Sequence, residues 1–219
     1  MKRLCFIMTL SVLVFGFKEQ AKKKIVFFGD SITQAAVGKD GYITKMDSII
    51  DAKGKEYELI GAGISGNRVE DLYERLDRDV LSKNPGVVVI WIGVNDVWHG
   101  KFVTDSNKLM FSWYYTSILR QLRERNIKVI MCTPGVVGEK KEQANKLDAE
   151  LNECADSIRA IAKRFNCPLV DLRKEFVKYD NKHNDANADN GILTGDGVHL
   201  NRTGNLFVAE KMYQVLKRQ

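Results

Sequence analysis

Five short apolar runs, separated by segments with helical periodicity, constrain the fold of this chain more than any other feature. Residues 87–93 (VVVIWIG) contain no polar residue, so a strand there should be buried on both faces, as strands of parallel sheets are. The other runs are KIVFF (24–28), YELIGA (57–62), KVIMCTP (128–134) and CPLVDL (167–172). Alternation of this kind predicts an α/β fold, with an open parallel sheet, helices on both faces and right-handed crossovers.

Four stretches between and after these runs carry apolar residues at helical spacing, and we expect them to be the buried faces of helices. The stripes are Val69, Leu72, Tyr73, Leu76 and Val80; Phe111, Tyr115, Ile118, Leu119 and Leu122; Leu147, Leu151, Cys154, Ile158, Ile161 and Phe165; and Leu206, Ala209, Tyr213 and Leu216. No repeat or linker interrupts the chain of 219 residues, so residues 22–219 are predicted to form one domain. The polar segment 183–191 (HNDANADNG) is expected to be a surface loop without EF-hand spacing.

The first 21 residues have the pattern of a signal peptide. A basic start precedes an uncharged run, Leu4 to Phe17, which is too short to span a bilayer comfortably. We place cleavage between Phe17 and Lys22, with an uncleaved anchor as the alternative. The protein is therefore expected to be exported to a periplasmic or extracellular location, with no stable membrane insertion after signal removal. Cys5 lies at the beginning of this run and not after it, which argues against a lipoprotein signal.

Charge and cysteine content argue against nucleic-acid and metal binding. The net charge is +6, but residues 1–24 carry six Lys or Arg and one Glu, so the rest of the chain is nearly neutral and lacks a basic footprint. Three cysteines follow the predicted signal peptide: Cys132, Cys154 and Cys167. Their number is odd and they lack C-x-x-C spacing, so we expect buried thiols and neither a disulfide framework nor a metal site. No metal or cofactor is predicted, and the sequence does not fix an oligomeric state.

Chemically capable residues follow three of the strands and precede the last helix. Because carboxyl ends of parallel strands share one edge of the sheet, these residues should lie together. They are Gly29, Asp30 and Ser31; Gly66 and Asn67; Asn95 and Asp96; and Asp196 and His199.

These residues include the parts that acyl transfer needs. Ser31 can be the nucleophile, His199 the base that takes its proton, and Asp196 the group that orients the imidazole. The backbone N–H groups of Ser31 and Gly66 and the side-chain amide of Asn95 are candidate oxyanion donors. His99 is the rival base, since it follows the Asn95 segment, and His199 is favoured because Asp196 lies at short range before it.

In this order the motifs resemble those of the SGNH (GDSL) hydrolases. FFGDSITQ resembles the first block with Ser31, GISGN the second with Gly66, IGVND the third with Asn95, and DGVHLN the last with Asp196 and His199. The SG context favours Gly66 over Gly63 as the donor, and Leu200 stands where many members have Pro. The resemblance implies a three-layer α/β/α, flavodoxin-like fold with about five parallel strands.

The predicted function is a serine esterase that forms an acyl-enzyme and hydrolyses short-chain esters, with acetyl esters of carbohydrates as the expected small-molecule or oligosaccharide substrates. Trp98 and His99 are the substrate-binding candidates, and Trp113 is expected to be exposed. Activity should require the unprotonated imidazole of His199, because only that form can take the serine proton. Asp30 is interpreted mainly as a cap for the helix that follows it.

Three alternatives remain open at this level. A lysophospholipase or thioesterase would use the same triad and differ in its acyl-chain preference. A flavodoxin-like binding module would hold a phosphate with the GDSITQ loop and would need neither Asp196 nor His199. A carbohydrate-binding relative without catalytic activity is disfavoured by the complete set of site residues.

Overall fold

The structure is a computed structural model and describes residues 22–54 and 57–219. Its centre is one sheet of five parallel strands in the order β2-β1-β3-β4-β5. The strands are β1 (Lys23–Gly29), β2 (Tyr57–Gly63), β3 (Val87–Trp91), β4 (Lys128–Cys132) and β5 (Leu169–Val170). The prediction of a parallel sheet is therefore confirmed. The signal peptide predicted over residues 1–21 lies outside the described residues.

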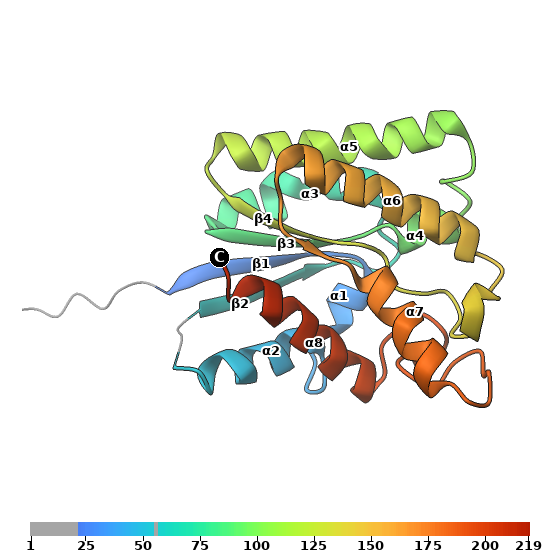
Figure 1. The fold of residues 1–219 in the computed structure, drawn as a ribbon. Coiled ribbons are helices and arrows are strands. Elements are labelled where there is room, and N and C mark those ends of the chain that lie inside the picture. Colours follow the sequence, from blue (N-terminus) through green and yellow to red (C-terminus); the bar gives the residue numbers. More distant parts are fainter. Residues whose placement is uncertain (1–21, 55–56) are drawn as a thin grey trace, which may run out of the picture.

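Helices cover both faces of this sheet and complete three layers (Figure 1). One layer contains α3, α5 and α6 and the other α2, α7 and α8, while the short helices α1 and α4 begin just after β1 and β3. The bounds are α1 (Ser31–Ala35), α2 (Tyr42–Asp51), α3 (Val69–Asp79), α4 (Val94–Trp98), α5 (Asp105–Glu124), α6 (Asp148–Phe165), α7 (Leu172–His183) and α8 (Arg202–Leu216). Leu81–Lys83 and Lys141–Gln143 form short 3₁₀ helices.

The core consists of two apolar clusters, one on each face of the sheet. Ile25 and Phe27 of β1 point into the cluster beneath α2 and α8, whereas Val26 and Phe28 point into the cluster beneath α3, α5 and α6. All five residues of β3 are buried, which agrees with the uninterrupted apolar run in the sequence. The sheet therefore has no solvent-facing side at its centre, and a polar ligand has access only at its edges.

The order of the strands determines where such a ligand can bind. The chain passes from β1 outward to β2 and then returns to the other side of β1 as β3. Loops leaving the carboxyl ends of β1 and β3 therefore diverge toward opposite faces, and this switch point is where open α/β sheets bind ligands. Ser31 and Asn95 follow these two strands directly.

Three details differ from the sequence-based expectations. Leu206, expected on the core face of the last helix, is 46% exposed, because α8 buries Val208, Ala209, Met212, Tyr213 and Leu216 instead. Cys132 and Cys154 are buried thiols as expected, but Cys167 is only partly buried. Asn184 is fully buried inside the segment predicted to be a surface loop, since its side-chain amide bonds the backbone of Glu139 and Ala188.

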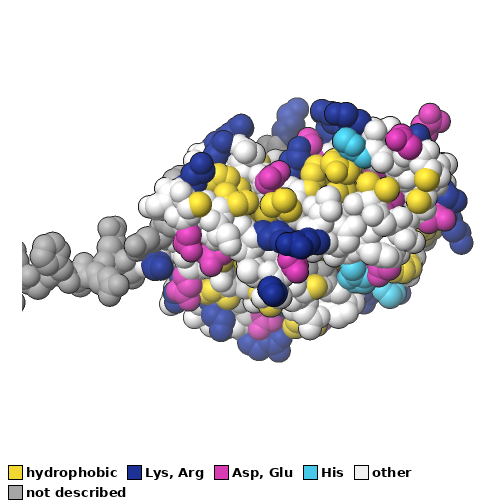
Figure 2. Space-filling view, turned by 90° about the horizontal axis from the view of Figure 1, so that it is seen from below, with side chains coloured by type: hydrophobic (Ala, Val, Ile, Leu, Met, Phe, Trp, Pro, Cys, Tyr) yellow, Lys and Arg dark blue, Asp and Glu magenta, His cyan; other side chains and the backbone are white. Residues whose placement is uncertain are grey.

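The outer surface carries charges of both signs. On the face formed by α2 and α8, Lys and Arg side chains alternate with Asp and Glu (Figure 2). Asp40 pairs there with both Lys45 and Arg202, and Lys211 pairs with Glu175. Within residues 22–54 and 57–219, no helix has the length and apolar character needed to cross a membrane.

Candidate active site

The turn between β1 and α1 presents Ser31 at the carboxyl edge of the sheet. Asp30 is the N-cap of α1, and its carboxylate accepts a hydrogen bond from the Ile32 N–H at 3.0 Å. A Cβ at Gly29 would lie 2.3 Å from Thr33 Oγ1 and 2.5 Å from the Trp91 carbonyl oxygen. Only glycine therefore fits at the end of β1, and the interpretation of Asp30 as a helix cap agrees with its hydrogen bond.

The loop before α8 brings His199 and Asp196 to this serine. Ser31 Oγ lies 2.9 Å from His199 Nε2, and His199 Nδ1 lies 2.7 Å from Asp196 Oδ2. The other carboxylate oxygen of Asp196 accepts the backbone N–H groups of His199 at 2.7 Å and Val198 at 3.0 Å. Partial burial acts to raise the pKa of Asp196, but the hydrogen bonds from His199 and Val198 together outweigh it, and the pKa lies below its ordinary value. An ionised carboxylate at Nδ1 leaves Nε2 free to accept the serine proton.

Two further predicted residues lie at neighbouring strand ends. Gly66 is exposed and has a φ of +77°, a conformation that side-chain-bearing residues rarely adopt. Asn95 in α4 is 6% exposed, and its side-chain amide donates one hydrogen bond to the Asn67 carbonyl at 3.0 Å. The second N–H of that amide is not used in this contact. Gly63 is different, because a Cβ there would lie 2.1 Å from the Gln34 backbone nitrogen, so this glycine is required by packing.

Arg75 of α3 joins these strand ends beneath the surface, and the sequence analysis did not identify it. Its guanidinium donates to the carbonyl of Gly29 at 2.8 Å, the carbonyl of Ala62 at 3.0 Å and the side-chain oxygen of Asn67 at 2.6 Å. Asp79 balances its charge at 2.9 Å. The available signal was a charged residue beside Leu76 on the apolar face of the predicted helix.

The two substrate-binding candidates occupy different positions. Trp98 is 48% exposed and lines a cavity of about 480 Å³ together with Val137 and the catalytic candidate Asp196. His99 ends α4 and is exposed, and the imidazole that contacts Ser31 belongs to His199. Trp113 is 48% exposed, as expected, but it contacts Tyr73 and Tyr114 and does not line this cavity.

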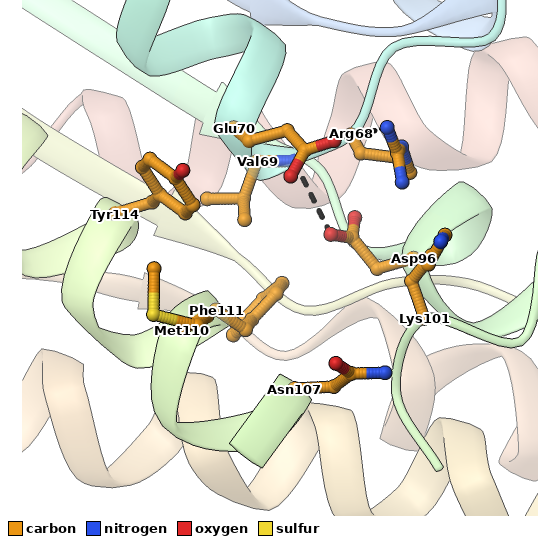
Figure 3. Close-up of a pocket in the computed structure, with 9 residues that line it drawn as sticks. All are labelled: Arg68, Val69, Glu70, Asp96, Lys101, Asn107, Met110, Phe111 and Tyr114. Carbon is orange, nitrogen blue, oxygen red and sulfur yellow. Dashed lines mark hydrogen bonds and ion pairs between the residues drawn. The ribbon is translucent and has the colours of Figure 1, made fainter. Parts of the chain in front are cut away.

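A second cavity of about 290 Å³ lies beside Asp96, between α3, α4 and α5 (Figure 3). Asp96 Oδ1 accepts the Val69 N–H at 3.3 Å, while Oδ2 is buried without a partner. Burial raises the pKa of Asp96 to about 7, and the hydrogen bond from Val69 only partly opposes this effect. Burial also raises the pKa of Asp30 to about 7, against the hydrogen bond from Ile32. Two buried carboxyl groups near the candidate site therefore change charge close to neutral pH.

Comparison with known proteins gives consistent matches over most of the chain. The model of the GDSL-like Lipase/Acylhydrolase family matches residues 27–206. A solved structure of an acetyl xylan esterase, AlAXEase, is 50% identical with a TM-score of 0.83, covering 87% of this chain and 98% of that one. An acetylxylan esterase of Geobacillus stearothermophilus is 27% identical over 85% of this chain and 90% of its own length. The Bacillus subtilis lipoprotein YqeF is 25% identical over the full length of both chains.

Proposed function

Because the chain belongs to the GDSL-like lipase/acylhydrolase family and is a carboxylic ester hydrolase, we propose that it removes short acyl groups from carbohydrate esters through Ser31, His199 and Asp196. Acetyl is the acyl group we expect. The observation that carries the proposal is the continuous series of contacts from Ser31 Oγ through the imidazole to the carboxylate, 2.9 Å and 2.7 Å long.

In the first half of the reaction, Ser31 Oγ attacks the acyl carbon and His199 Nε2 takes the serine proton. The carbonyl π electrons move to oxygen, and the backbone N–H groups of Ser31 and Gly66 and the amide of Asn95 bind the resulting oxyanion. When the intermediate collapses, the bond to the sugar oxygen breaks. The leaving alkoxide takes the proton from His199, and the acyl group remains on Ser31.

In the second half, a water molecule gives its proton to His199 and attacks the acyl-enzyme. Collapse of the second intermediate breaks the bond to Ser31 Oγ, which recovers the proton from His199, and the carboxylic acid leaves. Asp196 keeps its negative charge throughout and stabilises each imidazolium that forms. Its lowered pKa supports this role, because the carboxylate remains ionised at the pH values where an imidazole base works.

The proposed substrate class rests on the relatives and on the shape of the site. The 50% identical structure is named as an acetyl xylan esterase. Trp98 offers an aromatic face at a cavity that also contains Asp196, and aromatic faces can stack on sugar rings. Asn190 lines the same cavity with a side-chain amide that can hydrogen-bond sugar hydroxyls, whereas the amide of Asn145 is bonded to Lys140 and Asp148. We place the alcohol part of the ester in this cavity.

The test compares hydrolysis of p-nitrophenyl acetate, butyrate and octanoate and of acetylated xylo-oligosaccharides. Ser31→Ala should lower kcat by a factor on the order of 10⁴ or more. Ser65→Ala is the matched control, because Ser65 is exposed in the neighbouring loop and contributes its backbone N–H to Gln34. Equal rates in the wild type and Ser31→Ala would contradict the triad. A preference for octanoate would contradict the short-acyl assignment while leaving the triad in place.

We also propose that the enzyme is exported. The apolar run from Leu4 to Phe17 supports this, and so does the full-length similarity to a lipoprotein. Mass spectrometry of the protein recovered outside the cytoplasm tests the proposal. A mature N-terminus between Phe17 and Lys22 is expected, whereas a full-length protein retained in the cytoplasm would contradict it.

A further inference from the structure

Glu139 is a fully buried acid in the loop between β4 and α6, and the reaction described above does not use it. Its carboxylate binds three consecutive backbone N–H groups. Oε1 accepts those of Leu193 and Thr194, both at 2.7 Å, and Oε2 accepts that of Ile192 at 2.8 Å. Such charge-assisted hydrogen bonds are about twice as strong as neutral ones. Segment 192–194 is therefore fixed by a single side chain.

This segment leads directly into the catalytic turn. Thr194 accepts the Gly197 N–H on its hydroxyl at 3.0 Å, and the Gly195 N–H donates to the His199 carbonyl at 2.8 Å. Thr194 and Leu200 also form an isolated antiparallel bridge. These bonds close the turn upon itself, so the position of Thr194 determines the positions of Asp196 and His199.

The backbone around Glu139 binds the same loop at two more points. Gly138 donates to the Gly197 carbonyl at 2.8 Å, and Glu139 donates to the Asp189 carbonyl at 2.9 Å. The carbonyl of Glu139 accepts the side-chain amide of Asn184 at 2.6 Å. Residues 138–139 are therefore hydrogen-bonded to the loop on both sides of segment 192–194.

The catalytic side chains themselves are poorly enclosed. The side chains of His199 and Asp196 are 43% and 55% exposed, so packing contributes little to their orientation. Their alignment with Ser31 must come mainly from the backbone that carries them. A displacement of about 1 Å can lower a rate by on the order of 10²-fold.

We infer that Glu139 is a positioning residue for catalysis, which holds the turn of Asp196 and His199 in line with Ser31 through segment 192–194. The inference rests on the proposed roles of those three residues. It goes beyond them by assigning the alignment of the triad to a buried carboxylate about 60 residues earlier in the chain.

Glu139→Gln and Glu139→Leu test this inference. Glutamine keeps one acceptor oxygen for Leu193 and Thr194 but turns a donor toward the Ile192 N–H, whereas leucine loses all three bonds. We expect kcat for p-nitrophenyl acetate to fall by on the order of 10-fold to 10²-fold in the glutamine variant and further in the leucine variant, while KM changes by less than about threefold.

Asp171→Asn is the control, because Asp171 also accepts a backbone N–H and side-chain donors but contacts Arg159, Thr133 and Lys174 instead of the catalytic loop. It should lose stability and retain kcat. Proton NMR adds a readout of alignment. The downfield resonance of the His199 Nδ1–H, identified by its loss in His199→Ala, should persist in Asp171→Asn and broaden or disappear in Glu139→Gln.

A folded Glu139→Gln protein with wild-type kcat and an unchanged Nδ1–H resonance would overturn the inference. So would a loss of kcat in Asp171→Asn equal to that in Glu139→Gln, since stability alone would then explain both. Ser31→Ala separates failure of this inference from failure of the proposed function. Wild-type activity in Ser31→Ala would contradict the triad itself, whatever the effect of replacing Glu139.

Discussion

Replacement of Asp96 by Asn should stabilise the protein at neutral pH and have little effect on stability in acid. Asp96 is 4% exposed, and its Oδ2 has no hydrogen-bond partner. An asparagine of the same shape can keep the bond from Val69 through its oxygen, and it reproduces the uncharged form of the carboxyl group. The substitution therefore removes mainly the cost of ionising a buried acid.

The pKa gives the magnitude and its sign. Burial raises the pKa of Asp96 from 3.8 to about 7, a difference of about 3 pKa units, or about 4 kcal/mol at 1.36 kcal/mol per unit. The folded state binds the proton more tightly than the unfolded state. The stabilisation that this proton gives to the folded state is therefore fully present below the pKa of the unfolded state, declines as the pH rises, and is lost above about pH 7. About 3 kcal/mol of this change falls between pH 4.5 and pH 8.

Urea unfolding followed by tryptophan fluorescence at pH 4.5, 6 and 8 measures this difference. The free energy of unfolding of Asp96→Asn minus that of the wild type should increase with pH by about 3 kcal/mol. Asp77→Asn, at an exposed position of the neighbouring helix α3, should change the free energy of unfolding by less than about 0.5 kcal/mol at every pH. A difference for Asp96→Asn that stays constant within about 1 kcal/mol would show that this carboxyl group ionises normally and refute the reasoning.

Three further predictions concern catalysis. Asn95→Ala should lower kcat by about 10²–10³-fold with KM little changed, since we propose that its amide binds the oxyanion; an unchanged kcat in steady-state kinetics on p-nitrophenyl acetate would contradict that role. Asp196→Asn should lower kcat by about 10⁴-fold because the imidazole loses its orienting carboxylate; a loss below tenfold in the same assay would contradict its role. Trp98→Ala should raise KM for acetylated xylo-oligosaccharides but not for p-nitrophenyl acetate, and equal effects on both substrates would remove Trp98 from sugar binding.

The sheet was predictable from sequence because each strand left a local signal. The apolar run at 87–93 contains β3, and the strand ends at Gly29 and Gly63 agree with the predicted runs to within one residue. Helices α2 and α7 were not predicted. Helix α7 buries Arg173 and Asp180 along with Leu172 and Phe176. These charged residues interrupt its apolar stripe in the sequence, although Arg173 is neutralised in the fold by Asp148.

The proposed catalytic residues were identifiable because their side chains follow strand ends or precede the last helix in recognisable motifs. The groups that position them were not. Arg75 and Glu139 act on backbone atoms of residues 13 or more positions away in the chain. Backbone carbonyl and N–H groups are the same in every sequence, so no motif marks such contacts. Only folding brings the charged side chain and these distant backbone groups into contact.

Arg75 and Glu139 bind backbone groups of opposite polarity on the two sides of the site. The ends of β1 and β2 present carbonyl oxygens, and a cation there donates to those of Gly29 and Ala62; the Gly29 carbonyl also accepts the Ile64 N–H at 3.2 Å. The loop before α8 presents N–H groups that belong to no helix or strand, and an anion there accepts three of them. One buried charge therefore fixes the backbone next to the proposed nucleophile, and the other fixes the backbone that leads to the proposed base. Because each charged side chain is buried, its removal takes hydrogen-bond partners from buried backbone groups that cannot replace them with water. Neutral replacements at either position should therefore disturb the alignment of Ser31 with His199 more than substitutions of exposed residues in the same loops.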